Sequence, residues 1–383
     1  MNGGKVYEDG FCAVFQNQDE FLDCISRIGR NSSWDVRRSK SLRLAALQEG
    51  SDLVRELKEE YEKEGLDPEI ITDTVLNTGL LLKVKGRYYP IRSCAIKSIL
   101  DRAGISGNGL KRVEKQVYAR ILNDCLKTAK GEALIRISEG KISAVLGGDS
   151  HDYSILDMEQ IFRHTVEYLK DNYRGCRYLA GFYEHEMASA LWELSGNDEL
   201  LDAYRKEISL AGKIPEQMKA VVRVTTSDTG VGGANIFPML LAGKENRTIS
   251  LGSPLRLGHR NGSSIREFDE QLRMLYGKYQ LAAGNLIRLL KVEIQYPISC
   301  MKRVLDRLQV PKKYAAEAVE IFQAQNGEAP CTAHDIYYAM GEIPFFLSCD
   351  GEEGSRLARV EENISRALSL NWNEYDIAGD YKW

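Results

Sequence analysis

Strand-type and helix-type hydrophobic patterns occupy different parts of this chain, and this separation restricts the folds open to it. Alternating apolar and polar residues predict strands between positions 80 and 257. The clearest case is the hairpin EALIRISEGKISAVLGG (132–148), in which a Glu-Gly turn joins two alternating runs. After Ser263 the apolar residues recur three or four positions apart, and the first helix there begins with a capping box from Ser264 to Glu267.

These patterns predict an α+β protein with a mainly antiparallel central β-sheet and flanking helices, followed by a C-terminal helical domain. A chain of 383 residues is longer than a single hydrophobic core usually supports. We therefore expect an N-terminal helical segment at 1–75, a central α+β domain at 76–262 and a C-terminal helical domain at 263–383. Within the first of these parts, the apolar spacing predicts helix over 17–64.

The composition excludes several classes of protein. No stretch approaches the roughly 18 apolar residues that a membrane span requires. The start, MNGGKVYEDGFCAVF, lacks the basic flank and long apolar run of a secretory signal. The eight cysteines form no C-x-x-C pair, which indicates reduced thiols and not a disulfide framework or a zinc ribbon. We expect a cytoplasmic protein that does not bind membranes.

Positive charge is concentrated between Lys83 and Lys130. This basic segment carries a net charge of +9, whereas the whole chain carries −4. Such a local excess favours contact with a polyanion, so we expect nucleic acid, single-stranded DNA included, to bind here. The residues expected to bind it are Lys85, Arg87, Arg92, Lys97, Lys111, Arg112, Lys115 and Arg120. The alternative is that these cations pair with carboxylates elsewhere, such as those of ELKEEYEKEGLDPE (56–69).

A glycine turn and three tyrosines lie within the same basic segment. Gly104-Ile-Ser-Gly107 separates two predicted helices, and a G-x-x-G turn grips the backbone in one class of RNA- and ssDNA-binding domain. Tyr88, Tyr89 and Tyr118 offer rings on which bases can stack. The alternative is an ordinary turn between two helices.

The stretch TTSDTGVGG (225–233) has the groups that an anion-binding loop needs. Glycine-rich backbone can direct several N–H groups at one anion, and hydroxyl groups add further donors. The candidate ligand residues here are Thr226, Ser227, Asp228, Thr229 and Gly230. Neither the G-x-x-x-x-G-K-[ST] spacing nor the G-x-G-x-x-G spacing is present, however. The alternative is a wide turn in which Asp228 and Thr229 bond backbone donors.

A second candidate anion loop, LGHRNGSS (257–264), lies between a predicted strand and the N-terminus of a long helix. His259 and Arg260 follow the strand, and Ser263 and Ser264 precede the helix, whose dipole favours anions. An arginine fork suits a phosphate group. The alternatives are that Arg260 pairs with an acidic neighbour and that Ser264 only caps the helix.

Two clusters combine acidic residues with histidine. GGDSHDY offers Asp149, His151 and Asp152, and FYEHEM offers Glu184, His185 and Glu186. With Asp228 and His259 these groups are competent ligands for a divalent metal. Their spacing matches no known metal motif, and adjacent strand residues point to opposite faces. We therefore expect no cofactor, with a metal at Asp149, His151 and His185 as the alternative. Nucleophilic catalysis has little support, because no G-x-S-x-G elbow is present.

The order of several segments resembles a known family. YYPIRSCAIKSILDRAGISG, ALIRISEGKISAVLGGDSHDYSIL, VVRVTTSDTGVGGANI, LGHRNGSSIREFDEQL and ARVEENISRALSLNWNEYD are similar to the phage/plasmid-like proteins of unknown function. The resemblance covers about residues 80–378. It implies a mobile genetic element, a prophage, conjugative plasmid or integrative element, on which DNA handling and counter-defence are common tasks. The family has no established active site, so it implies no catalytic residue.

Three hypotheses follow. The first is nucleic-acid binding through the basic segment for a mobile element. The second is a nucleotide- or small-ligand-binding protein or hydrolase, which requires the 225–233 and 257–264 loops to converge with Asp149, His151 and His185 in one cleft. The third is a protein-interaction or counter-defence module, as a homo-oligomer or bound to a host or phage protein, with Trp372, Tyr375 and Trp383 as anchors.

Overall fold

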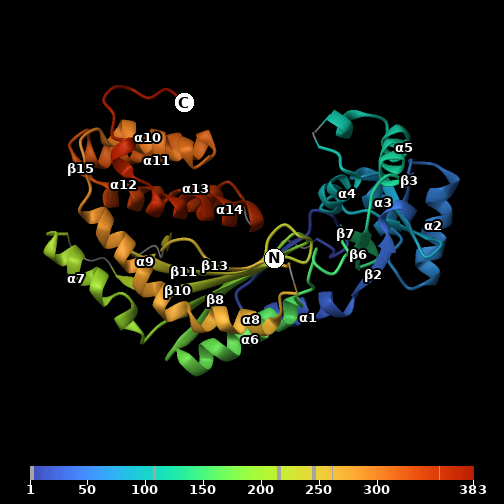
Figure 1. The fold of residues 1–383 in the computed structure, drawn as a ribbon, viewed down its shortest axis with the longest axis horizontal. Coiled ribbons are helices and arrows are strands. Elements are labelled where there is room, and N and C mark those ends of the chain that lie inside the picture. The colour runs from blue at the N-terminus through green and yellow to red at the C-terminus, as the bar shows by residue number, and fades with distance from the viewer. Residues whose placement is uncertain (1–3, 107–108, 214–216, 244–246, 261, 353) are drawn as a thin grey trace.

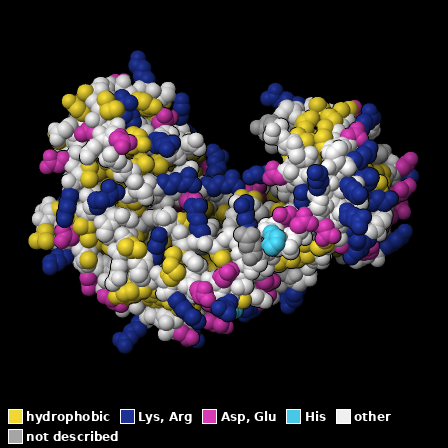
Figure 2. Space-filling model, in the orientation of Figure 1, with side chains coloured by type: hydrophobic (Ala, Val, Ile, Leu, Met, Phe, Trp, Pro, Cys, Tyr) yellow, Lys and Arg dark blue, Asp and Glu magenta, His cyan; other side chains and the backbone are white. Residues whose placement is uncertain are grey.

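The protein has two lobes (Figure 1). The computed structural model describes residues 4–106, 109–213, 217–243, 247–260, 262–352 and 354–383. The small lobe consists of residues 32–147, and the large lobe consists of residues 12–30 and 158–383. The small lobe is therefore inserted between the first helix and the remainder of the large lobe. Figure 2 shows a hollow between the lobes, which we call the interlobe cleft.

An antiparallel sheet forms the centre of the large lobe. Its order is β1-β8-β9-β10-β11-β12, and β13 also pairs with β11. The strands are β1 (Cys12–Phe15), β8 (Cys176–Glu184), β9 (Ala188–Leu194), β10 (Met218–Thr226), β11 (Ala234–Ala242), β12 (Arg247–Ser250) and β13 (Leu255–Leu257). Every pairing in this sheet is antiparallel, which confirms the predicted α+β class with its mainly antiparallel central sheet.

Helices cover this sheet (Figure 1), because their apolar stripes need a surface on which to be buried. On one side lie α1 (Gln18–Arg30), α6 (Met158–Asn172), α7 (Asp202–Leu210), α8 (Ile265–Arg273) and α9 (Leu275–Leu290). The predicted capping box at the start of α8 is confirmed, with Ser264 and Glu267 bonding reciprocally. The fully buried hydroxyl of Tyr279 on α9 donates to the backbone carbonyl of Val221 and so fixes helix to sheet.

The remaining helices complete the large lobe. They are α10 (Pro297–Arg307), α11 (Lys312–Asn326), α12 (Ala333–Met340), α13 (Ile343–Cys349) and α14 (Gly354–Ser365), with a small β14 (Glu293–Ile294) and β15 (Cys331–Thr332) pair. Their buried side chains belong to the same core as those of the sheet, so the core continues across position 262. Trp372, an expected docking anchor, is 1% exposed and donates to the carbonyl of Ala367 (3.0 Å).

The described residues of the small lobe form two short sheets and four α-helices. One sheet is β2 (Ser32–Arg38), β6 (Glu132–Ser138) and β7 (Lys141–Gly147); the other is β3 (Arg43–Ala46), β4 (Leu80–Val84) and β5 (Arg87–Pro90). The helices are α2 (Asp52–Lys63), α3 (Glu69–Leu76), α4 (Ala95–Ala103) and α5 (Lys115–Leu126). The predicted β6–β7 hairpin is confirmed, and its turn residues Glu139 and Gly140 both have positive φ, as a two-residue hairpin turn requires.

The prediction of helix over 17–64 is right for α1 and α2 but wrong for 32–46. There the chain forms β2, which pairs with β6, and β3, which pairs with β4. These partners lie far away in sequence, so local spacing gives no sign of them. Strand pairing thus crosses position 75, the expected end of the N-terminal segment. Whether the expected parts fold as separate units stays a prediction.

Two further observations concern the chain as a whole. All eight cysteines are free thiols. Among the described residues, no helix combines the length and the apolar character that crossing a membrane would demand.

Candidate functional site at the lobe junction

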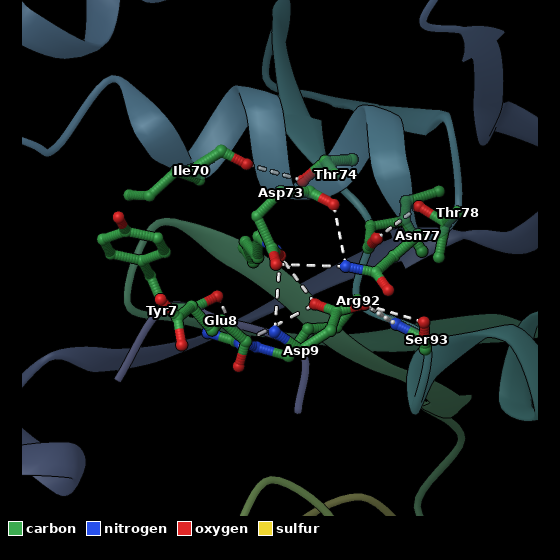
Figure 3. A network of polar contacts seen from close by, with 12 residues as sticks. Tyr7, Glu8, Asp9, Ile70, Asp73, Thr74, Asn77, Thr78, Arg92 and Ser93 are labelled. Carbon is green, nitrogen blue, oxygen red and sulfur yellow. Dashed lines mark hydrogen bonds and ion pairs between the residues drawn. The ribbon is translucent and has the colours of Figure 1, made fainter. Parts of the chain in front are cut away.

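A buried cluster of charged side chains joins the two lobes (Figure 3). Arg92, 1% exposed, follows β5 of the small lobe. Its Nη1 donates to the backbone carbonyls of Tyr7 (2.9 Å) and Glu8 (3.3 Å) and lies 2.8 Å from Nε2 of His185. His185 belongs to the β8–β9 turn of the large lobe, so Arg92 bonds to both lobes and to the N-terminal residues.

Lys141 forms the second half of this cluster. Its fully buried Nζ donates to Asp9 Oδ1 (2.9 Å) and to the carboxylate of Asp73. The other oxygen of Asp9 accepts from the backbone N–H and the hydroxyl of Ser93, both at 2.7 Å. Two cations thus face two carboxylates, which is the arrangement that makes buried charge tolerable. This cluster holds the structure together and leaves no charge unbalanced.

A cavity of about 740 Å³ opens beside this cluster. Asn77, Thr78 and Ser93 lie in its wall and belong to the network drawn in Figure 3. The rest of the wall is Cys94, Ile96, Lys97, Leu100, Asp101, Ile105, Ser106, Lys115, Tyr118 and Glu186. Glu186 comes from the β8–β9 turn, so this first cavity lies where the two lobes meet. Its volume falls in the range of small-ligand pockets.

The charges in the first cavity are unevenly paired. Glu186 accepts from Arg359 of α14 (3.1 Å). Among the described side chains, no carboxylate lies within 4.0 Å of Lys97 or Lys115. The hydroxyl of Tyr118 is buried without a hydrogen-bond partner in the described structure, and burial raises the pKa of this phenol. Two lysines therefore remain available to an anion.

The cations of the basic segment divide into two sets. Some are paired as the alternative interpretation expects: Arg87 with Glu60 (3.2 Å) and Glu64, Lys85 with Asp35 (3.2 Å), and Lys127 with Asp124 (2.7 Å). Arg92 is buried in the junction cluster, and Arg102 donates to the backbone carbonyls of Lys130 and Glu132. Among the described side chains, those without a carboxylate partner are Lys83, Lys97, Arg112, Lys115, Arg120 and Lys130. The side chain of Lys111, and Gly107 of the glycine turn, lie outside the described residues.

The loop at 225–233 packs against the small lobe. Asp228 accepts from Arg136 of β6 (2.9 Å), whose side chain is 3% exposed. Thr226, Ser227 and Thr229 are buried, and Ser227 Oγ lies 3.1 Å from Thr229 Oγ1. Burial raises the pKa of Asp228, while the adjacent Arg136 opposes that rise. The polar side chains of this loop therefore form hydrogen bonds with one another and an ion pair with the small lobe.

Two glycines of this loop allow close packing. Gly230 has φ +77°, and a Cβ there would lie 2.8 Å from Cδ2 of Leu146 on β7. A Cβ on Gly233 would lie 2.2 Å from the carbonyl oxygen of Leu257. Both positions therefore require glycine for steric reasons. This matches the wide-turn interpretation of the stretch.

The loop at 257–264 meets the same region. His259 is 5% exposed and stacks on Tyr153 (4.8 Å between ring centres), and its Nδ1–H donates to the carbonyl of Ser154 (3.0 Å). Burial lowers the pKa of His259. The hydroxyl of Ser263 donates to the carbonyl of Arg260 (2.6 Å), and Ser264 caps α8. This loop lies beside 225–233, because Tyr153 also contacts the carbonyl of Ser227 (3.3 Å). His185, which the hypothesis places in the same cleft, lies instead in the junction cluster.

A second cavity, of about 520 Å³, lies near these loops. The exposed Arg260 and His151 line it with Ser98, Asp101, Arg102, Val145, Leu146, Gly147 and Asp152. Asp101 of α4 lines both cavities, so the two cavities adjoin at this helix.

The three expected metal ligands occupy different surroundings. Asp149 accepts from the backbone N–H of Glu132 (3.2 Å), His151 lines the second cavity, and His185 belongs to the junction cluster. Over the part of the chain that the structure describes, no three His, Cys, Asp or Glu side chains are grouped so as to hold a metal ion.

Several residues of this site were not anticipated from the sequence. Asp9 and Asp73 give no local signal, because their partners are distant in the chain. Arg136 and Lys141 do give one, because each is a charged residue within an apolar strand of the β6–β7 hairpin. A charge at such a position implies a buried partner.

Comparison with known proteins yields no match to a family model, to a curated protein or to a solved structure. The resemblance to phage/plasmid-like proteins therefore stays a prediction.

Proposed function

We propose that this protein binds single-stranded nucleic acid at the interlobe cleft, with helices α4 and α5 contacting the phosphates. The observation that carries this proposal is the convergence of Lys97 and Lys115 on the first cavity without a carboxylate partner among the described side chains. Lysines left unpaired at a concave site attract anions, and a polyanionic backbone gains affinity from each phosphate that they neutralise.

The shape of the first cavity favours a single strand. A volume of about 740 Å³ suits a ligand of a few rings, far less than a duplex occupies. Ile96, Leu100 and Ile105 supply apolar wall for a base, while Lys97 and Lys115 supply charge for the phosphates. Proteins that bind single strands without reading sequence combine a positively charged groove with aromatic rings on which bases stack, and the wall of this cavity includes Tyr118.

The resemblance to phage/plasmid-like proteins supports a setting for this activity. We infer that the protein serves a mobile genetic element, in which single strands arise during transfer and recombination. This inference depends on the resemblance alone.

Fluorescence anisotropy with a labelled oligothymidine across a salt series tests the proposal. The double variant Lys97→Gln/Lys115→Gln should bind more weakly, and its plot of log affinity against log salt should be shallower by about 0.7 for each phosphate that is no longer neutralised. The matched control is Lys170→Gln/Lys206→Gln, which removes the same charge from exposed positions on α6 and α7. The proposal fails if the native protein does not bind at the lowest salt, or if both double variants behave alike.

A second candidate, small-ligand binding, is favoured by the meeting of 149–154, 225–233 and 257–264 beside the second cavity. Arg260 and His151 would then hold an anionic group. Calorimetric titration with a nucleoside triphosphate distinguishes this candidate, because Arg260→Gln should abolish the heat of binding and Lys97→Gln should not. Equal heats for native protein and Arg260→Gln would exclude it.

A further inference from the structure

We infer that the large lobe supplies the second half of the binding surface, through a phosphate site formed by Arg256 and Arg366. This inference rests on the proposed function: the site would bind a phosphate of the same nucleic-acid strand beyond the first cavity. The single carboxylate of Glu362 lies between these two arginines and stands where a phosphate would bind.

The geometry of this site is simple. Arg256 lies on β13 and Arg366 directly after α14. Both donate through Nη2 to the same oxygen, Glu362 Oε1, Arg366 at 3.1 Å. The arginine side chains are 53% and 58% exposed, and that of Glu362 is 23% exposed. Two guanidinium groups that share one carboxylate leave one positive charge uncompensated at an open surface.

Such a site can accept a phosphate at little cost. Exposed ion pairs contribute little to stability, so either arginine can release Glu362 without unfolding the lobe. Guanidinium groups bind phosphate through two parallel hydrogen bonds and keep their charge at all accessible pH. The internal carboxylate then acts as a competitor that holds both side chains ready.

The position of α14 connects this site with the first cavity. Figure 1 shows α14 on the large-lobe side of the interlobe cleft and α4 on the small-lobe side. Figure 2 shows Lys and Arg side chains on the large-lobe wall of the interlobe cleft, where Figure 1 places α14. Arg359, one turn before Glu362 on α14, bonds Glu186 (3.1 Å), and Glu186 lines the first cavity with Lys97 and Lys115. A strand leaving the first cavity therefore passes Arg359 and reaches the Arg256–Arg366 pair.

The fixed orientation of α14 supports this path. The carboxylate of Glu184 at the end of β8 accepts from the backbone N–H of Ser355 (3.0 Å) in the first turn of α14. Gly354, with φ +66°, lets the chain approach that carboxylate closely. The first turn of α14 is thus held to the end of β8, next to the turn that carries His185 and Glu186.

The test uses the full-length protein and a labelled oligothymidine. Arg256→Gln/Arg366→Gln should weaken binding about tenfold at moderate salt, as expected for charge-assisted hydrogen bonds to phosphate. Glu362→Gln should strengthen binding about threefold, because it removes the competing carboxylate. The matched controls are Arg266→Gln and Glu270→Gln, an exposed pair on α8 below the sheet, and neither should change the affinity.

The predicted gain in affinity of Glu362→Gln distinguishes the inference from misfolding, because a misfolded variant would lose affinity. If the native protein binds, Lys97→Gln/Lys115→Gln weakens binding and the changes at 256, 362 and 366 have no effect, this inference is overturned and the proposed function stands. If the native protein does not bind, both are overturned.

Discussion

The guanidinium of Arg92 and the imidazole of His185 lie 2.8 Å apart, Nη1 to Nε2, and this contact joins the small lobe to the large lobe. The same Nε2 lies 2.9 Å from the carbonyl oxygen of Glu8, which can only accept, whereas arginine can only donate, so the tautomer of His185 decides which of these two contacts is a hydrogen bond. Burial, reinforced by the charge of Arg92, holds the pKa of His185 well below its usual value. The histidine is therefore neutral at physiological pH and lies against a permanently charged guanidinium from the other lobe.

Replacing Arg92 should destabilise the protein strongly. Arg92→Met removes the buried group that donates to the carbonyls of Tyr7 and Glu8 and that contacts His185, and we expect a loss of about 3–5 kcal/mol in the free energy of unfolding. Lys85→Met is the control, since Lys85 is 69% exposed and its pair with Asp35 should contribute less than about 1 kcal/mol. Urea denaturation measures both. Equal losses would show that Arg92 has no structural role beyond its charge.

The carboxylate of Asp228 should matter for stability and not for ligand binding. Asp228→Ala leaves Arg136 buried without its partner, so we expect a loss of about 3–5 kcal/mol. Replacing both residues together, as Arg136→Met/Asp228→Leu, should restore most of it, because an apolar pair can fill a buried ion-pair site. A double-mutant cycle by urea denaturation measures the coupling. A coupling energy near zero would make the 225–233 loop a candidate ligand site again.

Two glycines in that loop should respond differently to alanine. Gly230→Ala introduces a Cβ at positive φ and 2.8 Å from Leu146, so we expect a loss of about 1–3 kcal/mol. Gly232→Ala meets no atom within 4 Å and should change the free energy of unfolding by less than about 0.5 kcal/mol. Thermal melting of the two variants side by side measures the difference. A phosphate-cradling loop would instead require both glycines for binding and neither for stability.

His334 should make the protein less stable in mild acid. Burial, with help from the charge of Lys213, lowers the pKa of His334 to about 4, and its ring is 5% exposed beside Tyr204. The unfolded chain binds a proton near pH 6.5 and the folded chain near pH 4, so this contribution is complete above pH 6.5 and is lost as the pH falls towards 4. The full effect corresponds to about 3 kcal/mol.

Urea denaturation at pH 7.5, 6.0 and 5.0 measures this dependence in native protein and in His334→Gln. The variant should lose less stability between these values than the native protein does. His164→Gln is the control, because that ring is 37% exposed and pairs with Asp269. Parallel pH curves for native protein and His334→Gln would contradict the prediction.

Asp101 should oppose the binding of a polyanion. Asp101, on α4, lines the first cavity with the two lysines and the second cavity with Arg102 and Arg260. Asp101→Asn should therefore tighten oligothymidine binding about threefold at low salt, with a smaller effect at high salt because the repulsion is screened. Anisotropy titrations at two salt concentrations measure this. Unchanged affinity at both would indicate that no phosphate approaches α4.

Local patterns in the sequence predicted much of the fold. The α+β class, the β6–β7 hairpin and the capping box at Ser264 all depend on residues within a few positions of one another. The β2 and β3 strands could not be predicted in this way, because their pairing with β6 and β4 is what makes them strands. For the same reason, local patterns do not predict that the small lobe is inserted into the large lobe.

The site was predictable to a smaller extent. The sequence predicts Lys97, Lys115 and the FYEHEM turn as candidate site residues, but it does not predict which cations form ion pairs. Arg87 and Lys97 look alike in the sequence, yet Arg87 bonds Glu60 and Glu64 whereas Lys97 faces the first cavity. Pairing depends on which surfaces meet, and that is a property of the tertiary fold.

The insertion of residues 32–147 has a consequence for biosynthesis. As the chain leaves the ribosome, the small lobe has all its strands early, whereas Cys12 of β1 must wait for Glu184 of β8. Until then α1 has no core to cover its apolar residues Phe21, Ile25 and Ile28. The nascent chain therefore carries a folded small lobe while β1 and α1, which precede it, are still unfolded. These N-terminal elements are the part that chaperones would need to protect.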